Sequence, residues 1–140
     1  MSAQTLSTAT STLPRHALVV DDDPLMLDMV SDLLRNAGVL RVTCANDGKA
    51  GLDALDHAGA SADLIVCDLS MPGLDGFELM EKLATRHYTG RVLLVSGTEA
   101  RVLNSASLMA KFHRLNIVGG LAKPPTRAAL AAALRHVHGA

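Results

Sequence analysis

Five polar side chains in the sequence each end or directly follow an apolar run: they are Asp21, Asp22, Asp68, Ser96 and Lys123. Carboxylates that come together repel each other, and they raise one another's pKa unless a cation lies among them. Mg²⁺ suits such a group, because it binds one or two carboxylates and keeps water positions open for a phosphate. The residue types therefore predict a magnesium site formed by the three aspartates.

Asp68 has the chemistry of a nucleophile within this group. A carboxylate that is already ionised can attack phosphorus and form an acyl phosphate without a general base. The Lys123 ammonium can pair with Asp68 or with a phosphoryl oxygen, and the Ser96 hydroxyl can donate to the same group. These residues together predict transfer of a phosphoryl group to Asp68.

Buried parallel strands are needed to position these side chains. The apolar runs 64–67 and 92–95 lack alternation, which is typical of strands covered on both faces. We predict strands over residues 16–22, 39–45, 62–68, 91–96 and 117–122. The second strand is predicted to lie at an edge, because its alternation of polar and apolar residues is weak.

Helices are predicted between the strands from apolar residues at three- and four-residue spacing. Asp23, directly ahead of Pro24, is interpreted as a helix N-cap rather than a metal ligand. Gly38 is expected to end that first helix, and the segment Asn46-Asp47-Gly48 to cap the second. The predicted helices span residues 24–37, 48–58, 74–86, 99–113 and 126–138.

The alternation of strands and helices implies a parallel sheet covered on both faces and joined by right-handed crossovers. We predict an α/β, flavodoxin-like, doubly wound fold of five strands in the order 2-1-3-4-5 with five helices. Strands 1 and 3 then meet at the switch point of the sheet. This topology brings the carboxyl ends of strands 1, 3, 4 and 5, and thus the five polar side chains, to one crevice.

Composition excludes several classes of protein. A length of 140 residues predicts one domain, with residues 1–15, rich in Ser, Thr and Ala, as a flexible tail. A net charge of -1 without a Lys/Arg run, and an aromatic content of 2%, argue against binding of nucleic acid. Because no apolar run reaches membrane length and no signal peptide is evident, a soluble cytoplasmic protein is expected. Cys44 and Cys67 lie in apolar runs and are predicted to be reduced core residues.

Residues 16–138 resemble the receiver domain of two-component response regulators, in the CheY-like superfamily. Four segments in the correct order, each at a predicted strand end, carry the resemblance. They are Val19-Val20-Asp21-Asp22-Asp23, Asp68-Leu69-Ser70-Met71-Pro72-Gly73-Leu74-Asp75-Gly76, Val95-Ser96-Gly97 and Leu121-Ala122-Lys123-Pro124. The resemblance implies that residues 16–140 form a receiver domain.

The resemblance also implies a role for each residue of the site. Asp68 is the phosphoacceptor, and its donor is a sensor histidine kinase or a phosphotransfer protein. Ser96 is the switch hydroxyl, Lys123 contacts the phosphoryl group, and the Lys123-Pro124 bond is expected to be cis. Mg²⁺ is the implied cofactor, and its ligands are Asp21, Asp22, Asp68 and the backbone carbonyl of Ser70.

A receiver signals through a partner and assists only its own phosphorylation and dephosphorylation, so no independent enzyme activity is expected. The new charge is expected to shift the surface formed by the predicted fourth helix, fifth strand and fifth helix. The same surface is the candidate face for a homodimer. Direct binding to nucleic acid or membrane is not expected. The downstream partner stays open, as does the choice between a stand-alone regulator and part of a longer one.

Two features depart from the family pattern. Gly120 occupies a position, three residues before Lys123, where receivers often carry an aromatic residue. Paired rotamer switching of Tyr and Thr cannot run in its usual form, because glycine has no side chain. The region between Ser96 and Lys123 is also several residues longer than usual. Both features predict that phosphorylation of Asp68 changes the output surface by a route other than the one usual in the family.

Two other functions are compatible with parts of the sequence. A small Mg²⁺-dependent phosphatase or phosphotransferase could also use an Asp nucleophile, but such enzymes of the haloacid-dehalogenase type want a second Asp two residues later, where Ser70 stands. A degenerate receiver could serve as a dimerisation module. The intact acidic site argues against that function, whereas Gly120 is compatible with it.

Overall fold

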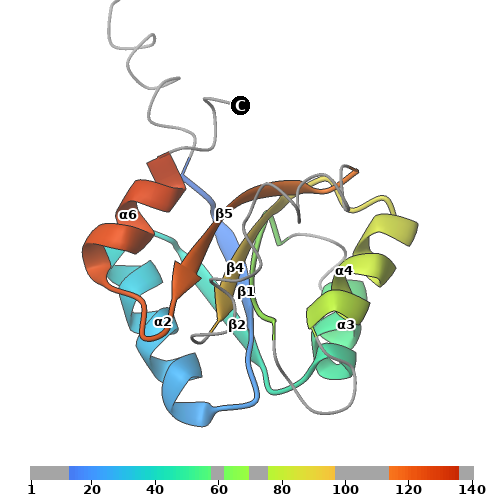
Figure 1. Cartoon of the computed structure of the whole chain (residues 1–140), viewed down its shortest axis with the longest axis horizontal. Helices are drawn as coiled ribbons and strands as arrows, with labels where there is room; N and C mark the ends of the chain where they lie inside the picture. The colour runs from blue at the N-terminus through green and yellow to red at the C-terminus, as the bar shows by residue number, and fades with distance from the viewer. Residues whose placement is uncertain (1–12, 58–61, 70–75, 97–113, 136–140) are drawn as a thin grey trace, which may run out of the picture.

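The sheet has the predicted topology. The computed structural model describes residues 13–57, 62–69, 76–96 and 114–135, and its five strands are all parallel (Figure 1). The order β2-β1-β3-β4-β5 confirms the flavodoxin-like arrangement, with β1 beside β3 and β2 at an edge. The strands are β1 (His16–Val20), β2 (Arg41–Ala45), β3 (Leu64–Asp68), β4 (Arg91–Ser96) and β5 (Asn116–Ala122).

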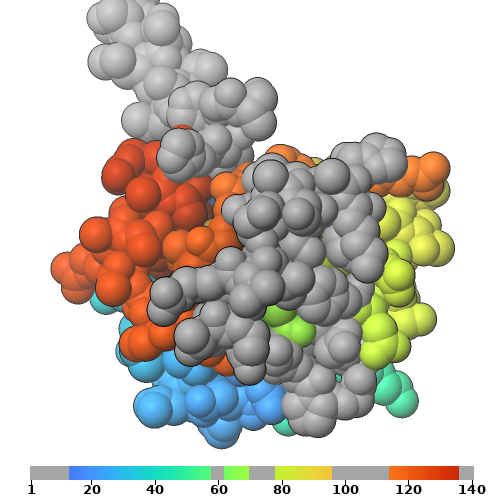
Figure 2. Space-filling view, in the orientation of Figure 1, coloured from blue at the N-terminus to red at the C-terminus, as the bar shows by residue number. Residues whose placement is uncertain are grey.

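Four helices within the described residues cover the sheet: they are α2 (Pro24–Ala37), α3 (Gly48–His57), α4 (Gly76–Thr85) and α6 (Arg127–Arg135). Helices α2 and α6 pack on one face, and α3 and α4 on the other (Figure 1). In the space-filling view the surfaces of α6 and α2 lie on the left and that of α4 on the right (Figure 2). None of these four helices is long and apolar enough to cross a membrane. The helix predicted over residues 99–113 lies outside the described residues.

The central strands are buried on both faces, as the unbroken apolar runs predict. All five residues of β1 and all five of β3 are buried. Along β1, Leu18 and Val20 pack on the side of α3 and α4, whereas Ala17 and Val19 pack on the side of α2 and α6. Two aliphatic core layers therefore hold the carboxyl ends of β1 and β3 rigidly beside each other.

Helix α2 begins directly after the acidic segment. The Asp23 carboxylate accepts a hydrogen bond from the Leu25 N–H at 3.0 Å, so Asp23 is the predicted N-cap. Pro24 occupies the first turn, where its missing N–H costs nothing. At the other end Gly38 closes the helix with a φ of 110°. The cap thus fixes the point where the chain leaves Asp21 and Asp22.

Helix α4 ends in the same kind of left-handed turn as α2 but with histidine in place of glycine. The His87 N–H donates to the Ala84 carbonyl and the Tyr88 N–H to the Leu83 carbonyl, both at 3.0 Å. His87 has a φ of 58°. This conformation costs a residue with a Cβ on the order of 1–2 kcal/mol relative to glycine.

We expect His87→Gly to raise the free energy of unfolding by about 1 kcal/mol, because glycine adopts the left-handed turn without the Cβ penalty. Urea denaturation measures this change. The control is His87→Ala, which keeps the Cβ and should gain little. A glycine variant that is less stable than the wild type would show that the imidazole contributes more to the fold than the turn costs.

The prediction for the two cysteines is right for Cys67 and wrong for Cys44. Both are free thiols, and Cys67 is fully buried in β3. Cys44 is exposed, because β2 is an edge strand in which only Ala45 is buried. The Cys44 sulfur lies 3.0 Å from the Ser31 hydroxyl of α2.

The last residues of the predicted tail, 13–15, contact the folded domain. Leu13 packs against the core layer under α2 and α6. The Arg15 N–H donates to the Asp63 carboxylate at 3.1 Å, and the Arg15 carbonyl accepts from the Arg41 N–H at 2.9 Å. These bonds tie the entry of the chain to β2 and to the start of β3.

Candidate functional site

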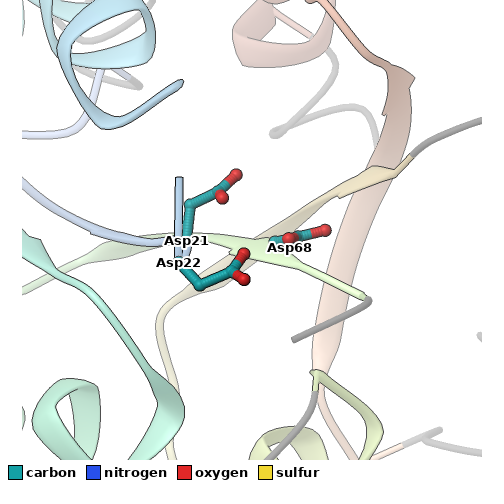
Figure 3. Close-up of side chains that lie close together, drawn as sticks. All are labelled: Asp21, Asp22 and Asp68. Carbon is teal, nitrogen blue, oxygen red and sulfur yellow. The ribbon is translucent and has the colours of Figure 1, made fainter. Parts of the chain in front are cut away.

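Three carboxylates meet where β1 and β3 end (Figure 3). Asp21 and Asp22 directly follow β1, and Asp68 is the last residue of the neighbouring β3. Each contributes one carboxylate oxygen to a group whose atoms all lie within 4.8 Å of one another. The structure therefore brings Asp68 to Asp21 and Asp22, although Asp21 and Asp68 are 47 residues apart in the sequence.

Two of the three carboxylates are buried. Asp21 and Asp68 expose 3% and 2% of their surface, whereas Asp22 is exposed. Burial raises the pKa of the Asp21 carboxyl; a hydrogen bond from the Asp23 N–H opposes this rise, and the charge of Asp68 adds to it. That hydrogen bond, 2.9 Å long, holds the Asp21 side chain in an Asx turn. The cap formed by Asp23 could be predicted from the sequence, whereas this second contribution, from the Asp23 backbone, could not.

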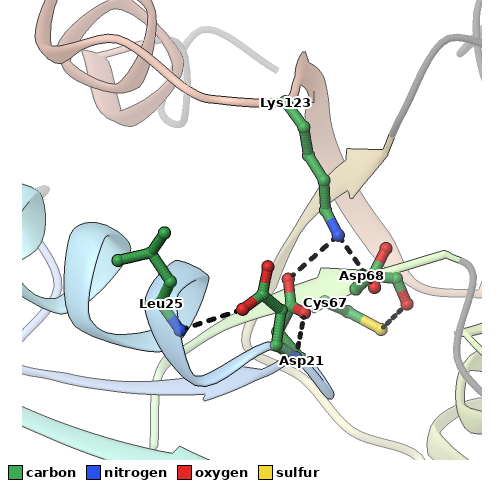
Figure 4. A network of polar contacts seen from close by, with 6 residues as sticks. Asp21, Leu25, Cys67, Asp68 and Lys123 are labelled. Atoms are coloured by element: carbon green, nitrogen blue, oxygen red, sulfur yellow. Dashed lines mark hydrogen bonds and ion pairs between the residues drawn. The ribbon is translucent and has the colours of Figure 1, made fainter.

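Lys123 reaches the carboxylates from the segment after β5. Its Nζ lies 3.0 Å from Asp68 Oδ2 and 3.3 Å from Asp21 Oδ2 (Figure 4). Burial by itself lowers the pKa of Lys123, but the hydrogen bond to Asp68 and the charge of Asp21 outweigh it, so the pKa is raised. The ammonium is therefore charged at neutral pH. The Lys123-Pro124 bond is cis, as the resemblance implied.

The donor set fits a divalent cation. Among the described residues three carboxylates lie beside one ammonium, so negative charges outnumber positive ones at the site. A hard cation with oxygen ligands suits this charge and the close spacing of the oxygens. Asp21, Asp22 and Asp68 are the described residues that could hold Mg²⁺. Ser70, whose carbonyl is the fourth predicted ligand, lies outside the described residues.

Ser96 lies at the same edge of the sheet as the carboxylates. It is the last residue of β4, and β4 pairs with β3 so that Val95 stands opposite Asp68. On its other side Ser96 pairs with Ala122, directly before Lys123. The backbone thus places Ser96 between Asp68, which ends β3, and Ala122, which directly precedes Lys123.

The backbone at position 120 does not require glycine. Gly120 is an exposed residue of β5, and among the described residues a Cβ there would meet only the Leu94 carbonyl oxygen, at 3.9 Å. Neither close packing nor a left-handed φ therefore excludes a side chain at this position. The absence of the usual aromatic residue is a property of the sequence that the fold does not impose.

Comparison with known proteins identifies the family to which the chain belongs. The chain matches the response regulator receiver domain over residues 17–135. It therefore belongs to the receiver domain family of two-component signalling. Asp21, Asp68 and Lys123 all fall inside the matched segment.

Individual relatives agree with this assignment. The chain is 36% identical over 109 residues to the transcriptional regulatory protein FixJ of Bradyrhizobium diazoefficiens, a match that covers 78% of this chain and 49% of FixJ. It is 32% identical over 111 residues to the regulator of RpoS of Escherichia coli, covering 79% of this chain and 30% of that protein. The chain thus spans half the length, or less, of these two relatives. The chemotaxis protein CheY4 of Vibrio cholerae superposes with a TM-score of 0.73 at 27% identity, over 87% of this chain and 97% of CheY4.

Because burial raises its pKa, the Asp21 carboxylate costs stability when it is charged. The Asp21 carboxyl binds its proton more tightly in the folded state than in the unfolded state. The loss of unfolding free energy that the charged carboxylate causes is therefore complete above the raised pKa, and it fades as the pH falls toward the ordinary pKa of 3.8. We expect Asp21→Asn to raise the free energy of unfolding at neutral pH, without divalent ions, by about 1 kcal/mol. Urea denaturation near neutral pH and near pH 3.8 should show this gain shrinking with acid.

The matched control is Asp22→Asn, which removes an exposed carboxylate of the same cluster and should change stability less. If Asp21→Asn instead lowers stability at neutral pH, the hydrogen bond to Lys123 outweighs the burial of the charge.

Proposed function

We propose that Asp68 accepts a phosphoryl group from a phosphohistidine of a sensor histidine kinase or phosphotransfer protein, with Mg²⁺ held by Asp21, Asp22 and Asp68. One observation carries the proposal. The buried Asp68 carboxylate lies both in the three-carboxylate group and 3.0 Å from the Lys123 ammonium. Family membership supports it, because the chain is a receiver domain.

The proposed transfer exchanges one bond to phosphorus for another. An oxygen of Asp68 forms a bond to phosphorus as the P–N bond to the donor imidazole breaks, and the imidazole nitrogen keeps the electron pair. When bound, Mg²⁺ supplies positive charge to the phosphoryl oxygens. Lys123 already contacts Asp68 and Asp21, so its ammonium can pair with a phosphoryl oxygen after transfer.

The proposed output is a change of surface. An acyl phosphate at Asp68 adds negative charge beside Lys123, which directly follows β5 and precedes α6. Movement of Lys123 and Ser96 toward the new group would shift β5 and α6. These two elements, with the helix predicted over residues 99–113, form the proposed docking or homodimer face. In this role the chain assists only its own phosphorylation and dephosphorylation and has no further substrate. We propose a cytoplasmic location for it.

The proposal concerns the receiver domain and leaves the kind of output unspecified. The two relatives are longer than the matched segment, so the proposal covers both a receiver joined to an output domain and one that acts through protein contacts alone. The donor and the downstream target are proposed only by chemical class: a phosphohistidine protein and a protein that recognises the altered surface.

Intact mass spectrometry after incubation with acetyl phosphate tests the proposal. We expect the wild type to gain one phosphoryl group with Mg²⁺ and none when the metal is removed with a chelator. Continuous release of phosphate from a panel of phosphate esters would favour a phosphatase instead. No gain in mass under any condition would favour a degenerate receiver.

A further inference from the structure

Two adjoining cavities open at the end of the sheet opposite the carboxylates, where the strands begin. The first, of about 570 Å³, lies between the turn after α4 and the start of β5. Its lining residues are Ala84, His87, Tyr88, Thr89, Arg114 and Asn116. The second, of about 620 Å³, shares His87, Tyr88 and Thr89 with the first. Both volumes lie in the range of sites for small molecules.

Among its described lining residues, the first cavity offers hydrogen-bond donors and positive charge but no carboxylate. Arg114 supplies a guanidinium, Thr89 a hydroxyl, Asn116 an amide and His87 an imidazole. All four residues are exposed, so a ligand from solvent can reach them. A guanidinium with neighbouring neutral donors is suited to a phosphate group, whose oxygens accept several hydrogen bonds at once.

The carboxylates of the second cavity are already engaged. Asp56 forms an ion pair with Arg86. Asp63 accepts hydrogen bonds from the backbone N–H groups of Arg15 and His16, at 3.1 Å and 3.0 Å. These contacts partly offset the negative charge of the adjoining cavity, so the first cavity keeps its preference for an anion.

Tyr88 forms a fixed wall between the two cavities. Its ring is buried, and its hydroxyl donates to the Ala62 carbonyl at 2.9 Å. A Cβ at position 90 would overlap the Tyr88 hydroxyl, so Gly90 is needed for this ring position. The wall is therefore formed before any ligand arrives, which lowers the cost of ordering the site on binding.

His87 gives an independent indication of function. It lines both cavities, and it occupies a left-handed position that glycine would occupy at lower cost, as Gly38 does after α2. Residues held in costly backbone conformations cluster at ligand sites. The imidazole thus stands at the cavity mouth although the turn itself favours glycine.

We propose that the cavity lined by His87, Thr89, Arg114 and Asn116 binds the phosphate group of a small molecule. The site is separate from the carboxylates, because it lies at the amino ends of the strands whereas Asp68 ends β3. A receiver with such a site could respond to a phosphorylated metabolite as well as to its donor protein.

Titration of the ¹⁵N-labelled protein, in a chelator that keeps Mg²⁺ away from the carboxylates, tests the proposal. The probes are inorganic phosphate, adenosine monophosphate and a single-stranded oligonucleotide, and the readout is the amide shifts. We expect phosphate or the monophosphate to shift Thr89, Gly90 and Asn116 and to leave Asp21 and Asp68 unmoved. A stronger response to the monophosphate would indicate that the site binds the phosphate group of an organic ligand. Equal responses to the two probes would indicate that it binds the free anion.

Three variants sharpen the test. Arg114→Gln should weaken binding about tenfold, as loss of a charge-assisted hydrogen bond predicts. His87→Gly should also weaken it although the protein becomes more stable, so a loss of binding cannot reflect unfolding. Arg41→Gln removes an exposed charge at the same end of the sheet but outside the lining, and it should leave binding unchanged.

Three results would overturn the proposal. One is the absence of any shift with all three probes. Another is a shift confined to the carboxylate end of the sheet. The third is binding of the oligonucleotide alone, weakened equally by Arg114→Gln and Arg41→Gln, since that would indicate a general surface for polyanions.

Discussion

Asp68→Asn is expected to abolish the gain of a phosphoryl group from acetyl phosphate while the fold is kept. An amide oxygen is not ionised and is a far weaker nucleophile than a carboxylate oxygen, so no acyl phosphate should form. The substitution is isosteric, and the amide oxygen can still accept the hydrogen bond from Lys123. Intact mass spectrometry gives the phosphoryl content, and circular dichroism shows that the variant is folded.

The matched control for this variant is Asp23→Asn. Asp23 is a neighbour of the carboxylates in sequence, but its side chain caps α2, and asparagine caps a helix as well as aspartate does. The control should therefore take up a phosphoryl group like the wild type. Uptake by Asp68→Asn at the wild-type level would place the acceptor elsewhere in the chain.

Lys123→Met is expected to have the second largest effect, on stability as well as on transfer. The side chains of Asp68 and Asp21 expose only 1% and 5% of their surface, and Lys123 contacts both. Removing one partner of a buried ion pair leaves the other charge uncompensated, so without Mg²⁺ we expect a loss of about 3 kcal/mol of unfolding free energy. The rate of phosphoryl uptake should fall on the order of 100-fold, because a donor to the phosphoryl oxygens is lost.

The effect on stability should depend on pH in a defined direction. Because the pKa of Lys123 is raised above its ordinary value of 10.5, the contribution of its charge is complete at neutral pH. It is lost only as the pH rises through the raised pKa, where wild type and variant should converge. Urea denaturation at neutral and at alkaline pH measures the difference between the two proteins.

Two further variants separate this effect from a general change of charge. Lys49→Met removes an exposed lysine from the first turn of α3 and should change stability by less than about 0.5 kcal/mol. The double variant Lys123→Met with Asp68→Asn should recover part of the loss, because one buried negative charge is removed as well. If Lys123→Met is as stable as the wild type at neutral pH, the contacts with Asp21 and Asp68 contribute nothing to the fold.

The parts of the structure that follow from local pattern could be predicted from the sequence. The unbroken apolar runs before Asp21 and Asp68 gave buried central strands, and the alternation with helices gave the strand order. Because parallel strands share one carboxyl edge, the meeting of Asp21, Asp22 and Asp68 followed from the topology. The caps at Asp23 and Gly38 could also be predicted, as could a cap for α3 within the segment 46–48, since each depends on a few adjacent residues.

The features that depend on distant packing could not be predicted. Cys44 lies in an apolar run like Cys67, and only its place at the edge of the sheet makes it exposed. The left-handed turn at His87 carries no glycine to signal it. The phosphate-binding cavity joins Arg114 to the turn after α4, and no sequence motif links residues that far apart.

The phosphate cavity and the carboxylate site lie at opposite ends of the same strands, and β4 and β5 connect them. Arg91 and Asn116 begin these strands in register, and Ser96 and Ala122 end them in register. A ligand at the amino end and a phosphoryl group at the carboxyl end would therefore act on one pair of strands. Measuring phosphoryl uptake with and without bound monophosphate would show whether the two sites are coupled.

The central claim is that Asp68 is the residue that carries the phosphoryl group. Reduction of the phosphorylated protein with tritiated borohydride converts an acyl phosphate into a labelled alcohol, and peptide mapping then locates the label. We predict that the label lies at position 68 alone and depends on Mg²⁺ during phosphorylation. Label at Asp21, at Asp22 or at any other residue, with none at position 68, would contradict the account.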